Sequence, residues 1–553
     1  MKAVLLFLFL ALQSQAATYY VDYVGGNNAN AGTSTGAPWK HHPWDTNRTG
    51  SAAITLAAGD VVILKGGVEY ELLGTNNVLL ATSSGTLSSR IVLDGDSGVY
   101  ASRWGSGTNR AIIDGNFVAS RHVNITSHGS ITLNFLDLYA GGYGGNIVQF
   151  SSATNCTANE VLARERYDWN MASTSNKTGA YMLGIGGGIE CSGRSKNIII
   201  ERCEITKVGG GGTGAGDNCT DITIRSNYVH SYIVWSVSFA TDSSGEGLTN
   251  VYFHNNIIAN MYHYTGGYWS GALASELVNS STNENPHQDG IFIRQQVAAN
   301  TDGAIQNLQI FNNHFYNDLT TNATLATAWI FTSYIKTNGS IFLYNNVFNK
   351  PYATPSVSLG WNLFNDWTLK IYHNTFIGMN DLSVGVAITN PTFQVIARNN
   401  LFGGDTGWQT DSSYDATCAD MWLALNSDYN FYDTGADTVA YGPCLYNATL
   451  ATWRTTTGED ANSISGSSAW VNPQNWASSS SADWSLSASS AAKNIFPVLS
   501  TNTYPGADRD IVGNLRAATT SAGAYEYQAT ATTYRGFQFG VGVQLIGPGR
   551  LTQ

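Results

Sequence analysis

The sequence predicts an all-β chain wound into a solenoid of stacked parallel coils, with a cap at each end. Three observations predict it. Only 12% of the residues are charged while 58 are Gly, a composition that is poor in amphipathic helix formers. A short asparagine motif recurs from about residue 130 to 435, and a β-like run such as VYFHN or IFLYN precedes each copy. Repeats of strands favour stacked coils over a sandwich or a propeller.

The recurring motif is Asn, any residue, and then Ile, Val, Phe or Tyr. Its copies begin at Asn159, Asn227, Asn256, Asn313, Asn346, Asn374, Asn400 and Asn430, and Cys203 takes the same slot in ERCEI. From Cys203 onward the spacings lie between 24 and 33 residues, with one interval of 57 that predicts a coil with an inserted loop. An Asn amide can bond to equivalent amides above and below, and Asn tolerates the left-handed backbone of a sharp turn. We expect the residue two positions on to point inward and build an apolar stack.

The chain divides into four predicted parts. Residues 1–16 have the basic start, apolar run and small residues of a secretory signal peptide. Residues 17–115 should form the N-terminal cap and first coils, 116–435 the coil core, and 436–553 the last irregular coils and the C-terminal cap or tail. The sequence therefore predicts a secreted protein, extracellular or periplasmic, with no membrane insertion, and we expect a monomer. A net charge of −12 disfavours nucleic-acid binding.

Six cysteines are few for an exported chain of this length. Cys418 and Cys444 are far from the other four in sequence, so they are the predicted disulfide pair. Buried free thiols are the simplest interpretation of Cys156, Cys191, Cys203 and Cys219.

The chain resembles the secreted right-handed parallel β-helix proteins of the pectin-lyase-like superfamily. The resemblance lies in the opening TYYVDYVGGNNANAGTSTGAPWK (18–40) with GDVVILKGGVEY (59–70), in the asparagine repeat, and in DWSLSASSAAKNIF (483–496) with DRDIVGNLR and AGAYEY (508–527). It implies a single-domain right-handed parallel β-helix that acts on a polysaccharide. Because this scaffold serves lyases, hydrolases, epimerases and adhesins, the resemblance does not choose among them.

In such proteins the strand before each Asn-bearing strand belongs to another sheet, whose outer face commonly forms the sugar-binding groove. Reading backward from the repeat places seven polar residues on neighbouring coils of that sheet: Glu190, Asp217, Asp242, His287, Asp289, Arg294 and Lys336. We expect Asp217 and Asp289 to flank Asp242. A glycosidase needs two carboxyl groups at the scissile bond, so a hydrolase that cleaves glycosidic bonds is the favoured interpretation. The paired Asp-Asp and the Gly-His-Gly of well-known pectin hydrolases are missing, which argues against a polygalacturonase.

Two alternatives remain open. A polysaccharide lyase or epimerase would use His287, Arg294 or Lys336 as its base, with Asp217 and Asp242 holding Ca²⁺. The acidic net charge and the few lysines make this less favoured, and no cofactor is firmly indicated. The other alternative is a non-catalytic, adhesin-like β-helix that only binds glycans.

Aromatic residues could supply the walls of the groove, because sugars stack their apolar faces on aromatic rings. The predicted insertion from about residue 261 to 286 carries Tyr264, Tyr268 and Trp269. Trp235, Trp329 and Trp361 lie on the expected groove strands, where they would face either outward as subsites or inward as core.

Overall fold

The structure is a computed structural model. It describes residues 16–72, 79–105, 109–115, 121–139, 145–164, 187–206, 208, 211–230, 235–241, 246–259, 288–295, 304–316, 326–333, 339–349, 355–359, 368–377, 380–384, 394–403, 408–410, 425–433, 440–441, 448–472, 483–528, 544–545 and 551–552.

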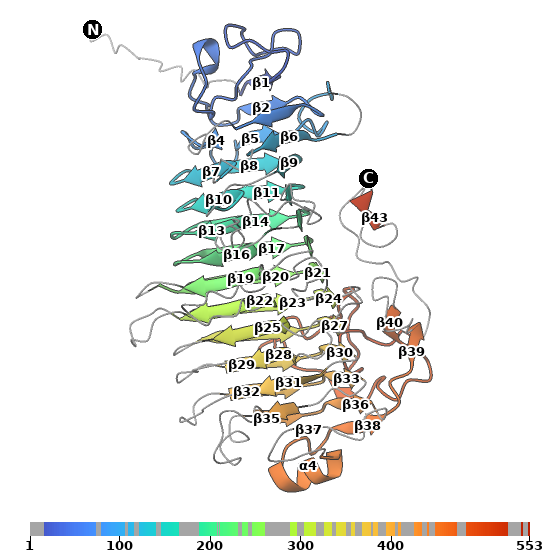
Figure 1. Cartoon of the computed structure of the whole chain (residues 1–553). Helices are drawn as coiled ribbons and strands as arrows, with labels where there is room; N and C mark the ends of the chain where they lie inside the picture. The colour runs from blue at the N-terminus through green and yellow to red at the C-terminus, as the bar shows by residue number, and fades with distance from the viewer. Residues whose placement is uncertain are drawn as a thin grey trace, which may run out of the picture.

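The described residues form three long sheets in which every strand pairs in parallel with its neighbours, one coil apart (Figure 1). Each coil runs from sheet A through sheet C to sheet B, and then begins the next coil in sheet A. Successive parallel strands with connections of one hand make a right-handed parallel β-helix, as the sequence predicted.

Sheet A has 13 described strands: β1 (Thr18–Val21), β2 (Val61–Leu64), β5 (Ile91–Asp94), β8 (Ile131–Asn134), β11 (Thr157–Asn159), β14 (Lys196–Glu201), β17 (Thr220–Arg225), β20 (Leu248–His254), β23 (Ile305–Phe311), β26 (Ser340–Tyr344), β29 (Thr368–Tyr372), β32 (Gln394–Arg398) and β35 (Leu425–Asp428).

Sheet C also has 13 described strands: β3 (Glu69–Glu71), β6 (Ala111–Asp114), β9 (Leu136–Tyr139), β12 (Leu162–Arg164), β15 (Glu204–Thr206), β18 (Tyr228–His230), β21 (Ile257–Ala259), β24 (His314–Tyr316), β27 (Val347–Asn349), β30 (Thr375–Ile377), β33 (Leu401–Gly403), β36 (Phe431–Asp433) and β38 (Ile464–Gly466).

Sheet B has 12 described strands: β4 (Leu79–Leu80), β7 (Val123–Thr126), β10 (Val148–Ser151), β13 (Ile189–Ser192), β16 (Gly211–Gly216), β19 (Trp235–Thr241), β22 (Gln288–Gln295), β25 (Ala326–Ser333), β28 (Pro355–Leu359), β31 (Asn380–Val384), β34 (Trp408–Thr410) and β37 (Ala440–Tyr441).

The asparagine repeat forms a continuous buried stack at the turn from sheet A to sheet C. The Oδ1 of Asn256 accepts from the backbone N and the Nδ2 of Asn227, at 2.9 and 3.0 Å. Asn256 in turn donates from Nδ2 to Ile224 O and to Asn313 Oδ1. The same amide-to-amide pattern continues through Asn346, Asn374, Asn400 and Asn430. The predicted stacking is confirmed from Asn227 onward.

Two details of that prediction are wrong. Asn159 pairs with Glu201 rather than with Cys203, so it lies two positions before the stack, and buried Val161 occupies the slot in its coil. The left-handed residue is also not the stacked Asn but the residue before it, for example Asn255 (φ 55°) and Asn312 (φ 54°). The stacked Asn is therefore selected for hydrogen bonding, whereas the preceding position is selected for its backbone conformation.

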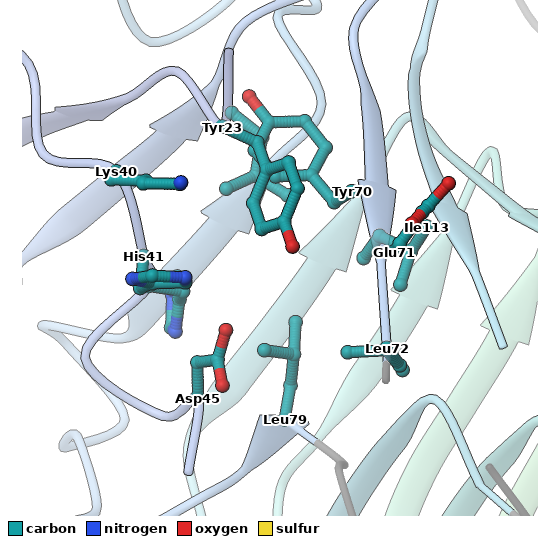
Figure 2. A pocket seen from close by; sticks show the side chains of 11 residues that line it. Tyr23, Lys40, His41, Asp45, Tyr70, Glu71, Leu72, Leu79 and Ile113 are labelled. Carbon is teal, nitrogen blue, oxygen red and sulfur yellow. The ribbon is translucent and has the colours of Figure 1, made fainter. Parts of the chain in front are cut away.

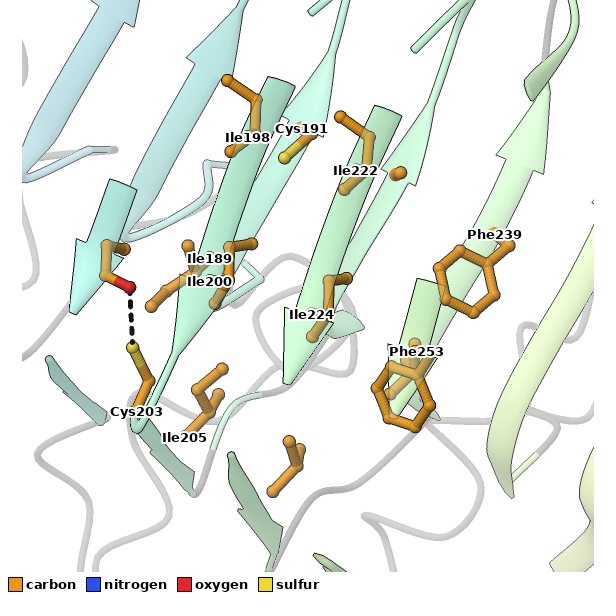
Figure 3. Packing of buried hydrophobic residues seen from close by; sticks show 14 of the residues in the cluster. Ile189, Cys191, Ile198, Ile200, Cys203, Ile205, Ile222, Ile224, Phe239 and Phe253 are labelled. Carbon is orange, nitrogen blue, oxygen red and sulfur yellow. Dashed lines mark hydrogen bonds between the residues drawn. The ribbon is translucent and has the colours of Figure 1, made fainter. Parts of the chain in front are cut away.

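The interior is filled by matching side chains of successive coils. Two residues after the last five stacked asparagines, the rings of Phe315, Phe348, Phe376, Phe402 and Tyr432 stack with centroids 4.6 to 5.3 Å apart. In earlier coils the same core is built from aliphatic side chains, among them Ile198, Ile200, Ile222 and Ile224 of sheet A (Figure 3). The expected apolar stack is confirmed.

The four cysteines expected to be free thiols are free and buried: Cys156, Cys191, Cys203 and Cys219. Burial raises the pKa of the Cys156 thiol to about 11 and that of Cys203 to about 12, so both stay protonated and unreactive. Cys418 and Cys444, the predicted disulfide pair, lie outside the described residues.

Both ends of the coil stack are covered. At the N-terminus the chain between β1 and β2, with the short 3-10 helix η1 (Gly50–Ala52), lies over the first coil (Figure 1). At the other end lies α4 (Leu450–Thr457), whose buried Trp453 donates to Asp460. The remaining described strands are three short antiparallel pairs: β39 (Trp470–Asn472) with β40 (Asp483–Leu486), β41 (Phe496–Pro497) with β42 (Thr519–Thr520), and β43 (Gln544–Leu545) with β44 (Leu551–Thr552). In the part of the chain that is described, no helix is long and apolar enough to cross a membrane.

Candidate active site

The strands of sheet B are kinked near their start, and this kink shows which of their side chains face outward. Ile147 and Val148 are consecutive and both join the core, as do Trp329 and Ile330. The residue before such a pair and the residue after it therefore face outward. Ala328 fits this pattern, because it packs with Phe292 and Phe331 in a cluster apart from the core.

One outward row runs along the sheet through seven coils. By strand register it consists of Asn124, Gln149, Glu190, Gly214, Ser238, Phe292 and Phe331. Successive members are about 4.8 Å apart. The row is polar as far as Glu190, has no side chain at Gly214, and becomes aromatic at Phe292. Its centre is therefore a half-buried carboxylate beside a glycine.

Glu190 is held in a network of amides. Its Oε2 accepts from Asn146 Nδ2 at 2.7 Å, and Asn146 Oδ1 accepts from the backbone N of Gly187 at 3.1 Å. Gln149 Oε1 accepts from Arg121 Nε at 3.1 Å, and Gln149 Nε2 donates to Ser192 Oγ at 2.8 Å. Such a network fixes the carboxylate in one orientation while leaving it partly open to solvent.

Glycines allow close backbone contacts around this carboxylate. A Cβ at Gly187 would overlap Asn146 Oδ1 and would lie 2.8 Å from Glu190 Oε1. A Cβ at Gly216 would lie 2.7 Å from Ala240 O, and one at Gly214 would overlap Ser238 O. Any larger residue would push the strands apart or displace the Asn146–Glu190 pair, so these positions require glycine.

Two rings and a cation lie further along the same face. Phe292 and Phe331 stack with centroids 5.8 Å apart, and the Arg294 guanidinium lies 5.5 Å from the Phe292 centroid. Arg294 is half-buried. It belongs to a second outward row, whose members on the three preceding coils are Ala240, Gly216 and Ser192. Arg294 and Glu190 therefore share the outer face but lie three coils apart.

Asp217 and Asp289 lie at opposite ends of sheet B. Asp289 pairs with Trp235 at the start of β19, whereas Gly216 pairs with Ala240 near its end, so Asp217 lies at the opposite end of the strands from Asp289. Six residues of strand separate them by about 20 Å. Asp289 is also fully buried, although it lies in the outward row of Ala328. Asp242, which the sequence places between them, lies outside the described residues, so its position stays a prediction.

Of the two orientations that the sequence left open for Trp329, the structure shows the inward one. Its ring is buried in the core, 5.7 Å from that of Phe315, at the corner between sheets C and B. Trp235 opens β19, and its side chain is not described. The remaining predicted site residues lie outside the described residues: Asp242, His287, Lys336, Trp361, Tyr264, Tyr268 and Trp269.

Sequence reasoning missed Arg121, Asn146, Gln149 and the glycines beside Glu190. A signal was present, because Arg121-x-x-Asn124, Asn146-x-x-Gln149, Gly187-x-x-Glu190 and Gly211-x-x-Gly214 occur in four successive coils with two inward residues between each pair. The irregular loop lengths between these coils concealed it.

No group of three or more His, Cys, Asp or Glu side chains that could hold a metal ion occurs among the described residues. Asp242, half of the calcium pair expected for a lyase, is not among them.

Comparison with known proteins gives no matching family model and no matching curated protein. Solved structures do resemble the chain. A pectate lyase, Pel9A, is 13% identical with a TM-score of 0.45, covering 93% of this chain and 97% of its own. A GH136 lacto-N-biosidase from Eubacterium ramulus is 11% identical with a TM-score of 0.43, covering 82% and 67%. PfbA, a surface adhesin of Streptococcus pneumoniae, is 11% identical with a TM-score of 0.36, covering 64% and 80%. Similarity at this level does not assign an activity to the chain.

Proposed function

We propose that this protein is an extracellular carbohydrate-active enzyme that cleaves glycosidic bonds of a polysaccharide on the outer face of sheet B. The observation that carries the proposal is Glu190, a half-buried carboxylate oriented by Asn146 on the outer face of sheet B. The amides and the guanidinium around it suit sugar hydroxyls, which both donate and accept hydrogen bonds. The signal-like N-terminus supports an exported enzyme.

Hydrolysis is the favoured chemistry. Glu190 supplies one carboxyl group, which would protonate the leaving oxygen or activate water. The second carboxyl group must lie about 5 to 9.5 Å from that of Glu190, depending on whether the enzyme retains or inverts the configuration of the sugar. Among the described residues, the candidate for this second carboxyl group is Asp217. Glu190 pairs with Gly214 of the next coil, and Asp217 follows Gly214 by three residues. Asp242 and His287 remain candidates from the sequence.

Elimination by a polysaccharide lyase, or epimerisation, is the second candidate. Arg294 favours it, because its guanidinium on the outer side of β22 could neutralise a uronate carboxylate. Lys336 or His287 would then be the base, and Ca²⁺ at Asp217 and Asp242 would assist. A protein that only binds glycans would use the same outer face without turnover.

The test is incubation with neutral and acidic polysaccharides. New reducing ends without ultraviolet absorbance of an unsaturated uronate identify a hydrolase, whereas that absorbance identifies a lyase. Glu190→Gln keeps the size and the Asn146 contact but cannot transfer a proton, so turnover should fall at least about 100-fold. Glu160→Gln, a half-buried glutamate at the sheet A turn, is the matched control and should retain activity.

Full activity of Glu190→Gln would show that Glu190 is not a catalytic residue. Glycan binding without any product would instead establish the binding-only alternative.

A further inference from the structure

Glu190 differs from the polar groups under the N-terminal cap because a substrate can reach it. Tyr23, His41, Asp45 and Glu71 line a space between the cap and the first coils (Figure 2), and this space has room for about one water molecule. Glu190, by contrast, is half-buried on the outer face of sheet B. The hydrogen bonds around Glu190 therefore bear directly on the proposed reaction.

A chain of hydrogen bonds leads from Arg121 to Glu190 across three successive coils. Arg121 lies just before β7, while Gln149 belongs to β10 and Glu190 to β13. Arg121 Nε donates to Gln149 Oε1 at 3.1 Å, and Asn146 Nδ2 donates to the same oxygen at 3.3 Å. Asn146 Nδ2 also donates to Glu190 Oε2 at 2.7 Å. One amide group thus connects the carboxylate to the arginine through Gln149, which is buried.

The direction of these hydrogen bonds is fixed. A guanidinium has no acceptor, so Gln149 must present its oxygen to Arg121. The Gln149 amide nitrogen then donates to Ser192 Oγ at 2.8 Å. Because the Gln149 oxygen only accepts, Asn146 must present its NH₂ group to it. The backbone N–H of Gly187 requires the same orientation independently, since it donates to Asn146 Oδ1 at 3.1 Å. Asn146 therefore presents a donor, never an acceptor, to Glu190.

This arrangement favours the ionised form of Glu190. An ionised carboxylate oxygen accepts a hydrogen bond more strongly than the oxygen of a neutral carboxyl group, and the positive charge of Arg121 acts in the same direction. The bond from Asn146 engages Oε2. The other oxygen, Oε1, lies beside Gly187, where even a Cβ would come within 2.8 Å of it. The missing side chain at Gly187 leaves Oε1 as the oxygen that can react.

We propose that Arg121, Gln149 and Asn146 are positioning residues that keep Glu190 ionised, so that Glu190 is the base or nucleophile of the reaction and not its acid. In an inverting hydrolase, Oε1 takes a proton from the attacking water, whose oxygen bonds to the anomeric carbon. In a retaining one, Oε1 itself bonds to that carbon, and water later displaces it. In both, the bonding electrons pass to the leaving oxygen, which takes a proton from the second carboxyl group. The reaction rests on the proposed function, whereas the protonation state of Glu190 is measurable without turnover.

The experiment is esterification of the full chain with a diazo reagent at weakly acidic pH, because such reagents attack protonated carboxyl groups. Peptide mass spectrometry gives the rate at Glu190. Asn146→Asp keeps the size and the acceptor for Gly187 N but turns a carboxylate oxygen toward Glu190, so the two groups must share a proton. Esterification of Glu190 should become at least about tenfold faster. Asn197→Asp makes the same change at an exposed amide of sheet A and is the matched control.

Arg121→Met tests the start of the chain. It removes the charge and the donor from a half-buried position, so the variant should fold with an unchanged melting temperature. Esterification of Glu190 should become about threefold faster, and the acidic limb of the pH profile of kcat/KM should move to higher pH. Arg121→Lys restores a charged donor and should return both properties toward wild type.

Unchanged esterification in both Arg121→Met and Asn146→Asp overturns the proposal. It is also overturned if Glu190 of the wild type is esterified as fast as in Asn146→Asp, or if Arg121→Lys behaves as Arg121→Met does. If no polysaccharide is cleaved while the esterification rates change as expected, the proposed function fails and the assignment of an ionised Glu190 stands.

Discussion

A single side chain in the asparagine stack satisfies several buried polar groups at once. Asn346 Oδ1 accepts from the backbone N and the Nδ2 of Asn313, both at 3.0 Å. Its own Nδ2 donates to Ile310 O at 2.9 Å and to Asn374 Oδ1 at 3.0 Å. Because the residue is fully buried, water cannot replace these bonds when the amide is removed.

Asn346→Ala should therefore lower the free energy of unfolding by about 3 kcal/mol or more, since it leaves buried donors without acceptors. Urea unfolding followed by circular dichroism measures it. Gln306→Ala, at an exposed position of β23, is the control and should change stability by less than about 0.5 kcal/mol. Equal effects of the two substitutions would contradict a stabilising role for the stack.

At the scale of elements, the chain after β40 turns back and packs along the coils. Tyr372 donates to Pro505 O at 2.6 Å, and Ala507 packs on Tyr344 and Tyr372. A buried ion pair between Arg516 and Glu526 organises this segment. Arg516 also donates to Asn345 Oδ1 at 3.0 Å and to Gly523 O at 2.9 Å. The planar guanidinium thus joins the segment to the asparagine turn.

Arg516→Lys keeps the charge but cannot reach the same set of acceptors, so we expect a loss of about 3 kcal/mol. Hydrogen exchange should speed up in residues 494–527 before it does in sheet A. Arg509→Lys replaces an arginine of the same segment whose side chain is 56% exposed and should be neutral. Unchanged exchange in Arg516→Lys would show that apolar packing alone holds the segment.

For the whole molecule, buried histidines couple stability to pH. Burial lowers the pKa of His42 to about 3, and those of His122 and His314 to about 4, from an ordinary value of 6.5. The rings stay neutral in the folded protein, whereas unfolding exposes them to protonation below pH 6.5. Their contribution to stability is therefore complete above pH 6.5 and is lost as the pH falls toward 4.

The free energy of unfolding should consequently fall between pH 6.5 and 4, by up to about 1.4 kcal/mol per pH unit for each of these histidines. Urea titrations at several pH values measure the slope. His122→Gln removes one titrating ring and should reduce the slope by about one histidine's share. A slope that His122→Gln leaves unchanged would show that other groups control the acid sensitivity.

Several features could be predicted from residues alone because they repeat. The spacing of the Asn-x-apolar motif predicted the length of each coil. The residue two positions after the Asn predicted the inner stack of Phe315, Phe348 and Phe376. These predictions succeed because each coil repeats the same local packing, so a short pattern contains the whole interaction.

Only the tertiary structure decided which side chains meet. Asp217, directly after β16, and Asp289 of β22 lie two coils apart, yet register places them at opposite ends of sheet B. Asn146 and Glu190 are 44 residues apart and touch. Loops of different lengths separate the coils, so distance along the chain carries no information about alignment across them. Register is set by parallel hydrogen bonding and by the kink at each corner of sheet B, and both exist only when the coils are stacked.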